Sequence, residues 1–347
     1  MHMILAFLLI LLAGISNGSF ALPTKHVVKW QFEHIWLHFS IWGFVILPWL
    51  TMVYLTPQIF QIYSKIPIDM LLIITLGGFF FGIGQICFAL ALNIIGIGLG
   101  FSINLGLGIV LGFGLPFIVQ HPHEIFTPFG LIILTGTILA IIGLGFSNYA
   151  GVLRDRNKLK VDFFKSTAKR NHLSGVILAI IAGLSSASQN FIFAYTNSIQ
   201  DLAKQIGASS FAAANIIWPG YLLCGFVPYM LYMLYLHYKN HSFEVYYQKG
   251  VGKYYLFAII MGIFSYGSLL VYSKASQLIG KFGPIIGWPI FMVIIILTSN
   301  FWGWKYDEWK NCGEKAENTM KFGLICFVIA IITLGYGLYI APVVKGT

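Results

Sequence analysis

Charged residues are scarce in this sequence. Only 9% of its 347 residues are Asp, Glu, Lys or Arg and 58% are hydrophobic, whereas about a quarter of the residues of a soluble domain carry charge. This composition excludes an ordinary soluble domain and is typical of a membrane protein. Cysteine is scarce as well, and its spacing excludes both a disulfide framework and a metal site. The four cysteines are Cys87, Cys224, Cys312 and Cys326.

Clusters of catalytic or metal-binding side chains are equally few. The run His121-Pro122-His123-Glu124 contains suitable residue types, but the proline prevents the two histidines from sharing one face of a helix. No second cluster accompanies this run. We therefore expect a short turn here, and a protein that is not an enzyme and has neither a metal site nor a cofactor.

Long apolar runs are what the sequence has in abundance. Ten segments have roughly the 20 residues that a helix needs to cross a hydrocarbon core of about 30 Å. They cover residues 4–22, 34–54, 71–93, 98–119, 127–149, 172–195, 211–236, 254–273, 283–304 and 320–341. The predicted fold is an all-α polytopic membrane protein with ten transmembrane helices. A signal peptide is the alternative for the first segment, but the basic region that begins such a peptide is missing.

Basic residues are distributed unevenly between the two sets of loops. Of the 21 lysines and arginines, 16 fall in the loops after spans 1, 3, 5, 7 and 9 or, for Lys321, at the adjoining end of span 10. By the positive-inside rule these loops are cytoplasmic, which places both termini outside a multi-pass protein of the cell (inner) membrane. The densest run, from Arg154 to Arg170, is expected to be a solvated loop and not a nucleic-acid-binding segment.

Short echoes between the two halves indicate internal repetition. Ala13-Gly14-Ile15-Ser16 in the first span recurs as Ala182-Gly183-Leu184-Ser185 in the sixth, at a matching depth. Because each half has an odd number of spans, the second half enters the membrane from the opposite side, as in transporters built from inverted repeats. We predict an N-terminal five-helix repeat (residues 1–150), a basic cytoplasmic linker (151–171) and a C-terminal five-helix repeat (172–347).

Several motifs, in order along the chain, resemble those of one family. They are Phe20, Pro23, Lys25, Val27, Lys29-Trp30, Glu33 and Trp36, then Ile46-Leu47-Pro48-Trp49, Gly82-Ile83-Gly84, and Glu308-Trp309-Lys310-Asn311 with Gly313. Together they resemble the bacterial L-rhamnose/proton symporter family of the drug/metabolite transporter superfamily. The resemblance implies a ten-helix sugar/cation symporter with two inverted five-helix halves. Residues 274–288 depart from the more polar pattern of the family, which leaves the identity of the sugar open.

The polar groups deep in the spans are uncharged. All eleven acidic residues lie in loops or at span ends, so the buried carboxylate that would suit a cationic drug is missing. Amides offer donors and acceptors together, which suits the vicinal hydroxyls of a neutral sugar. The alternative for each amide is a hydrogen bond between helices. The predicted substrate-binding amides are Asn17, Gln85, Asn104, Gln189, Asn190 and Asn215.

Aromatic rings are the predicted apolar part of the site, because the C–H face of a pyranose packs on a flat ring. The candidates are Trp218, Tyr266 and Trp288, with Tyr272 as a further one. Both tryptophans precede a proline, which removes a helical hydrogen bond and is expected to kink or unwind the helix there. Packing within the bundle or against lipid is the alternative for these rings.

Few titratable residues lie near the membrane to couple transport to an ion. His38 titrates near physiological pH and suits proton relay, with an interfacial histidine bonded to a carbonyl as the alternative. Glu33 follows Lys29 by four residues and is expected to form an ion pair with it, with coupling as its other role. If neither residue carries protons, sodium held by carbonyl and amide oxygens is the replacement.

The sequence therefore predicts a secondary active transporter that imports a neutral monosaccharide, such as a 6-deoxyhexose similar to L-rhamnose, with protons and by alternating access. The alternative is an exporter of a small metabolite or drug within the same superfamily. The expected partners are the solute and the lipid bilayer, with no nucleic acid. We expect a monomer or a weak homodimer.

Overall fold

The computed structural model describes residues 2–159 and 172–341, and these residues form helices joined by short turns, with no β-strand among them. Ten of the helical segments are long and apolar enough to cross a membrane. This finding confirms the predicted all-α polytopic fold.

In chain order, spans 1 to 10 are α1 (His2–Ser19) with η1 (Leu22–His26); α2 (Phe32–Ser40) with η2 (Ile41–Ile46) and α3 (Leu47–Leu55); α5 (Ile68–Ile95); α6 (Ile97–Gln120); α7 (Pro128–Leu159); α8 (His172–Tyr195); α10 (Ser210–Asn215) with α11 (Trp218–Asn240); α12 (Gly252–Ile279); α13 (Gly283–Lys305); and α14 (Glu314–Ile340). The connections contain the short helices α4 (Ile59–Lys65), η3 (Pro122–Glu124), α9 (Asn197–Gln205) and η4 (Phe243–Tyr247).

Two helices extend further than the sequence predicts. α7 continues to Leu159, so Arg154 lies on a helix and the prediction that it begins a loop is wrong. Leucine, arginine and lysine favour helix, and this extension contains no proline to end it. α14 begins at Glu314, where acidic residues in the first turn interact favourably with the helix dipole. Residues 160–171, the remainder of the predicted linker, lie outside the described residues.

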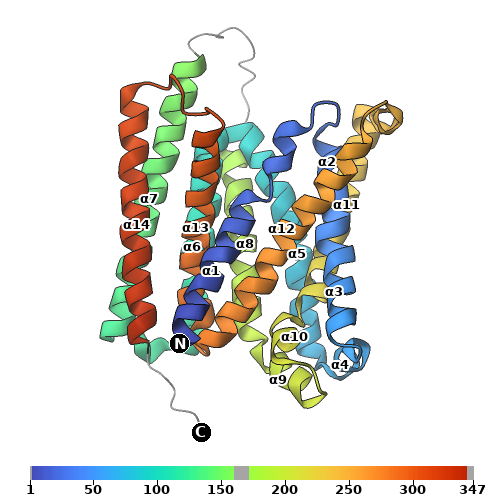
Figure 1. Cartoon of the computed structure of the whole chain (residues 1–347), viewed down its shortest axis with the longest axis vertical. Coiled ribbons are helices and arrows are strands. Elements are labelled where there is room, and N and C mark those ends of the chain that lie inside the picture. The colour runs from blue at the N-terminus through green and yellow to red at the C-terminus, as the bar shows by residue number, and fades with distance from the viewer. Residues whose placement is uncertain (1, 160–171, 342–347) are drawn as a thin grey trace.

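The ends of the described chain lie at the same end of the bundle, as ten spans require (Figure 1). The opposite end carries the connections α1–α2, α11–α12 and α13–α14 together with the C-terminal end of α7 (Figure 1). We call this end the basic end, because it carries the lysine- and arginine-rich loops.

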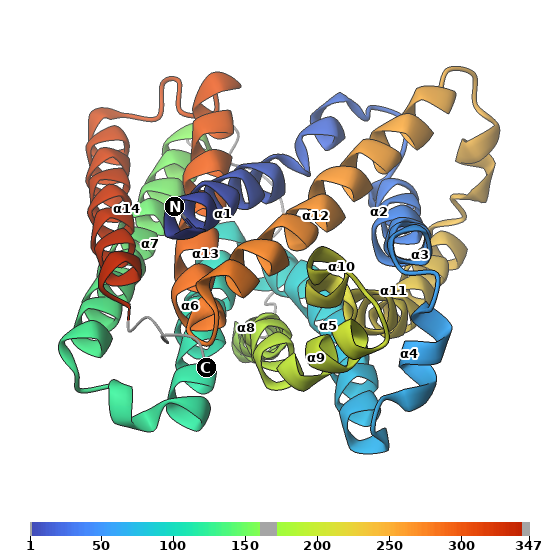
Figure 2. The same ribbon diagram turned by 60° about the horizontal axis from the view of Figure 1, so that its bottom comes forward.

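The helices pack in matching pairs. α1 (span 1) packs against α12 and α13 (spans 8 and 9), whereas α8 (span 6) packs against α5 and α6 (spans 3 and 4). The fifth and tenth spans, α7 and α14, stand side by side at one edge of the bundle (Figure 2). Each of these contacts in one half therefore has a counterpart in the other half, made by the spans five places away in the chain.

The two glycines of the repeated motif occupy equivalent contacts. A Cβ atom on Gly14 would collide with Ile294 of α13, and one on Gly183 would press against Leu107 of α6. Small residues allow helix backbones to approach closely. The motif thus lies where span 1 meets span 9 and, in the other half, where span 6 meets span 4.

The predicted proline kinks have different outcomes. Span 7 is interrupted between Asn215 and Trp218, where a turn separates α10 from α11. Pro219 follows in the first turn of α11, where a backbone N–H would have no acceptor within the helix. α13, in contrast, stays helical through Pro289. Span 2 contains the π-helical stretch η2 just before Pro48, an irregularity that no sequence pattern predicted.

Candidate functional site

Asn190 of α8 is fully buried and links four helices. Its Nδ2 donates to the carbonyls of Gly112 at 2.7 Å and Pro284 at 2.9 Å, and its Oδ1 accepts from the Tyr272 hydroxyl at 2.6 Å. These partners lie on α6, α13 and α12. Every strong hydrogen-bonding direction of this amide except one acceptor lone pair is therefore used inside the protein.

Both predicted tryptophans lie inside the bundle. The Trp218 indole donates to Ser273 Oγ at 2.7 Å, and the Trp288 indole donates to the Gly108 carbonyl at 2.9 Å. Trp218 is 1% exposed and Trp288 is 3% exposed. With their N–H groups bonded and their faces covered, these rings have the contacts that the packing alternative describes.

The structure brings Trp218 and Trp288 into one aromatic cluster, to which Asn190 is hydrogen-bonded. Tyr272, which donates to Asn190, has its ring centroid 5.7 Å from that of Trp288. Phe193 connects the other side, since its ring stacks on Trp218 at 5.5 Å and lies 5.9 Å from Tyr272. The cluster forms a frame between α8, α11, α12 and α13.

Three of the predicted amides have no hydrogen-bond partner in the described part of the chain: Gln85 on α5, Asn104 on α6 and Gln189 on α8. Asn104 and Gln189 are each 8% exposed, and Gln85 is partly exposed. An amide left unpaired in an apolar interior would cost about 1–3 kcal/mol. These three amides are therefore available to a solute or to water.

The three unpartnered amides lie on adjacent helices around α8. The glycine before Gln85 lies directly against Ser185, and the backbone carbonyl of Asn104 lies near Gly183. Gln85 and Asn104 thus flank α8 at a similar depth. Gln189 lies one helical turn beyond Ser185 on α8 itself.

The remaining predicted residues lie elsewhere in the interior. Asn17 of α1 donates to Ser268 Oγ at 2.8 Å. Asn215, at the end of α10, donates to Phe211 O at 3.0 Å, and its Oδ1 is buried with no partner within the described ranges. Tyr266 is buried, and its hydroxyl has no partner among the described residues. The same holds for the hydroxyl of Tyr221, which is not among the predicted site residues.

Glu33 occupies a buried polar site at the basic end. Its side chain accepts from Asn240 Nδ2 at 2.9 Å and from Ser242 Oγ at 2.8 Å, and the residue is 2% exposed. The predicted ion pair with Lys29 is wrong, because Lys29 Nζ instead donates to the Lys249 carbonyl at 2.7 Å. Hydrogen bonds to the carboxylate thus replace the expected local charge pair.

His34 lies next to this carboxylate and was not predicted as a site residue. Its Nε2 is 2.9 Å from the Ser242 carbonyl, and its Nδ1 is buried with no partner in the part of the chain that the structure describes. Because a carbonyl only accepts, Nε2 carries the proton of the neutral ring and Nδ1 presents the lone pair where a second proton binds. The His34 ring centroid is 4.7 Å from that of His237 on α11.

His38 follows one turn later on the same face of α2. Its Nδ1 is 2.9 Å from the His34 carbonyl, the contact named above as the alternative to proton relay. Its Nε2 makes no hydrogen bond to the described residues, and its ring lies 5.0 Å from that of Trp30. The spacing of His34 and His38 was a visible signal, whereas His237 is distant in sequence.

Tyr246 closes the histidine group from the η4 connection. Its hydroxyl lies 2.8 Å from His237 Nε2, and its ring centroid is 5.4 Å from that of His38. Burial, with Tyr255 and Glu33 nearby, raises the pKa of the Tyr246 phenol above its ordinary value. Tyr246 therefore stays neutral and keeps its hydroxyl proton.

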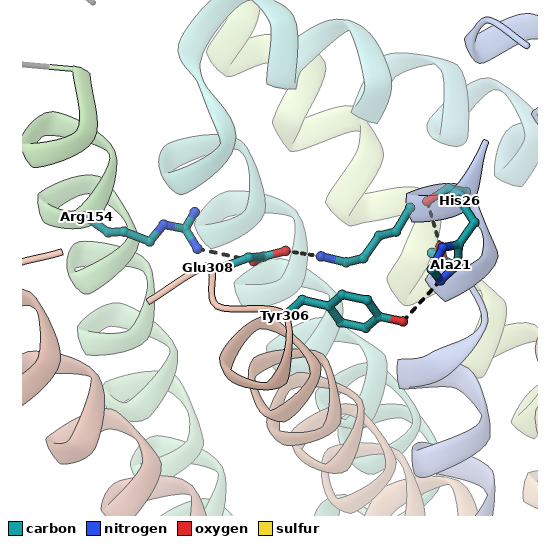
Figure 3. Close-up of polar contacts among 7 residues, drawn as sticks. Ala21, His26, Arg154, Tyr306 and Glu308 are labelled. Carbon is teal, nitrogen blue, oxygen red and sulfur yellow. Dashed lines mark hydrogen bonds and ion pairs between the residues drawn. The ribbon is translucent and has the colours of Figure 1, made fainter. Parts of the chain in front are cut away.

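A second charged group at the basic end surrounds Glu308, which follows α13. Lys25 from the first motif and Arg154 from α7 both pair with this carboxylate (Figure 3). His26 approaches the Tyr306 hydroxyl at 3.3 Å beside them. The first and last of the sequence motifs are therefore joined in space, across the two halves of the chain.

The part of the chain that the structure describes contains no side-chain cluster suited to binding a metal ion. Within residues 2–159 and 172–341, no group of three or more His, Cys, Asp or Glu is arranged to hold a metal ion. The arrangement offers uncharged hydrogen-bonding groups in the interior and titratable groups at one end.

Comparison with known proteins gives one consistent result. The family model described as L-rhamnose-proton symport protein matches residues 1–340. An L-rhamnose-proton symporter of Yersinia pestis (strain Pestoides F) is 26% identical over 339 residues, which cover 94% of this chain and 96% of the relative. One of Pectobacterium atrosepticum is 25% identical over 337 residues, or 93% of this chain and 94% of the relative.

Proposed function

The chain belongs to the family of L-rhamnose-proton symport proteins, and we propose that it imports a neutral 6-deoxyhexose, L-rhamnose or a sugar of the same class, together with protons. The observation that carries this proposal is a family match that extends over all ten spans. The protein is a multi-pass membrane transporter and not an enzyme.

The charge distribution supports a neutral solute. Asp162 lies outside the described residues, and the other acidic residues all lie at span ends or in connections. Burying an unpaired charge at the centre of the bilayer would cost several kcal/mol, so a charged solute would require a counter-charge there. A sugar requires only hydrogen-bonding groups and an apolar surface.

We assign solute binding to Gln85, Asn104 and Gln189, because these amides have no partner within residues 2–159 and 172–341. Asn190 and the two tryptophans would form the rigid frame behind them, since their polar atoms are already bonded. A sugar held by amides on α5, α6 and α8 would displace water that otherwise satisfies them.

Alternating access would follow from the inverted-repeat organisation. The matching helix contacts of spans five places apart support this organisation, as do the equivalent contacts of Gly14 and Gly183. The Glu308 ion pairs connect the first half (Lys25, Arg154) to the second at the basic end. They would hold that end closed and separate when it opens.

We assign proton coupling to Glu33 and His38, extended by His34. Glu33 is buried and its carboxylate accepts hydrogen bonds from two neutral side chains, those of Asn240 and Ser242, and His34 offers a buried ring nitrogen that has no partner among the described residues. Both residues contact Ser242, His34 through the backbone carbonyl and Glu33 through the hydroxyl, so the two titratable groups lie at one site. By the positive-inside rule the basic end faces the cytoplasm of an inner-membrane protein, with both termini outside.

Uptake of a panel of labelled neutral sugars into proteoliposomes tests the proposed function. An inward proton gradient should drive accumulation of L-rhamnose or another 6-deoxyhexose, and an inward sodium gradient alone should not. Accumulation with sodium only would replace the proton by sodium. Efflux of a preloaded solute without gradient-driven uptake would instead favour an exporter.

A further inference from the structure

A groove of about 650 Å³ lies between α13 and α14 toward the basic end. None of the residues that line it is assigned above to the sugar or to the proton. Its volume falls within the range of about 300–1,000 Å³ that is typical of ligand pockets. We call it the α13–α14 groove, and its walls include Leu297, Phe301, Trp304, Lys321, Leu324 and Val328.

The polarity of the groove changes along its length. α13 runs toward the basic end and α14 runs away from it (Figure 1), so Trp304 and Lys321 lie nearer that end than Leu297 and Val328. Apart from Asn300, the lining residues farther from that end are apolar, and the four charged lining residues lie nearer to it, at the rim. From residue 317 to residue 328, the lining of α14 covers ~16 Å of helix.

The groove opens on the outside of the bundle, the side that lipid would surround in a membrane. Phe301 is 53% exposed, Val328 is 50% exposed and Trp304 is 67% exposed. Indole rings favour the headgroup layer, and aliphatic and phenyl side chains favour the hydrocarbon. The gradient from Trp304 down to Val328 therefore follows the gradient of the bilayer itself.

The rim carries charges of both signs in equal number. Lys310 and Lys321 supply two positive charges, and Asp307 and Glu317 supply two negative ones. Lys310 Nζ is 3.8 Å from Asp307 Oδ2, and all four residues are exposed. A phosphate suits the lysines, and an ammonium group with N–H donors suits the carboxylates.

We propose that the α13–α14 groove binds one phospholipid with a phosphate and a primary ammonium in its headgroup, a phosphatidylethanolamine. One acyl chain lies along Leu297, Leu324 and Val328, and the headgroup lies over the rim. An anionic lipid without the ammonium would leave the two carboxylates facing a phosphate. A choline headgroup has no N–H to donate to them.

The deep part of this groove offers a sugar few hydrogen-bonding groups. The one amide in its wall, that of Asn300, already donates to Ser147 Oγ at 3.2 Å and to the Ile296 carbonyl at 2.9 Å. The remaining deep residues are apolar and cannot bond hydroxyls. The lipid site is therefore separate from the proposed sugar site, and its test does not depend on transport.

Native mass spectrometry of the purified protein tests the proposal, with phosphatidylethanolamine, phosphatidylglycerol and phosphatidylcholine of identical acyl chains. We expect one phosphatidylethanolamine to be retained at least tenfold more tightly than either of the others. Val328→Trp, which fills the groove, should weaken its retention at least tenfold. Ile329→Trp is the matched control, since Ile329 is 45% exposed on the same helix but does not line the groove.

The headgroup assignment has its own variant. Glu317→Gln should reduce the preference for phosphatidylethanolamine over phosphatidylglycerol and leave acyl-chain binding intact. Equal retention of the three lipids, preferential retention of phosphatidylglycerol by the unmodified protein, or equal effects of the two tryptophan substitutions would each overturn the proposal.

Discussion

Replacement of Asn190 by alanine should destabilise the fold. The substitution removes the hydrogen bonds to Gly112, Pro284 and Tyr272, which have lengths of 2.7, 2.9 and 2.6 Å. Hydrogen bonds between membrane helices contribute about 0.6 kcal/mol each on average. The Tyr272 hydroxyl would also lose its acceptor in a buried site, at a cost of about 1–3 kcal/mol.

Together these effects predict a loss of about 3 kcal/mol in the free energy of unfolding for Asn190→Ala. Tyr272→Phe removes one of the three bonds and leaves no orphaned hydroxyl, so it should cost only about 1 kcal/mol. Asn17→Ala is a control of the same chemistry, because Asn17 makes a single side-chain bond, to Ser268. Its cost should also be about 1 kcal/mol or less.

Reversible unfolding in mixed micelles, followed by circular dichroism, measures these differences. The double variant Asn190→Ala with Tyr272→Phe should be less destabilised than the sum of the single variants, because they share one bond. If Asn190→Ala unfolds like the unmodified protein and loses only sugar uptake, Asn190 binds the solute and its assignment to the frame is wrong.

Three further predictions concern the titratable groups. Glu33→Gln and His38→Gln should reduce proton-driven uptake at least tenfold while sugar counterflow persists; equal loss of both activities would show a structural role. Lys25→Gln and Glu308→Gln should show a coupling of about 0.5 kcal/mol in a double-mutant cycle of unfolding, since the two side chains are 32% and 40% exposed; zero coupling would contradict the pair. Burial, and then a nearby lysine, lower the pKa of His121 below 6.5, so the stability that its neutral form provides is present above pH 6.5 and is lost as the pH falls through its folded pKa. His121→Gln should therefore flatten the fall in unfolding free energy below pH 6.5, and an unchanged pH profile would refute this.

The spans could be predicted from the sequence because the requirement that produces them is local. A helix that crosses lipid needs about 20 apolar residues in a row, and such runs are visible directly. The extension of α7 beyond residue 149 does not follow from the apolar run, which ends there, although arginine and lysine are good helix formers. The π-helical η2 has no local pattern of its own.

The polar sites were harder to predict because their partners are distant in sequence. Glu33 was expected to pair with Lys29, its neighbour on one turn, but the structure gives it Asn240 and Ser242 from the other half. Residue type identified the amides in the spans. Which of these amides form hydrogen bonds depends on how helices far apart in the sequence pack together, and no local pattern in the sequence indicates that packing.

Proton movement caused by sugar tests the central claim most directly. L-rhamnose is added to proteoliposomes in weakly buffered medium without an imposed gradient, and the external pH is followed with a dye. The account predicts an alkalinisation that requires the sugar and the protein, as protons enter with the solute. Sugar entry without any change in pH would contradict proton symport.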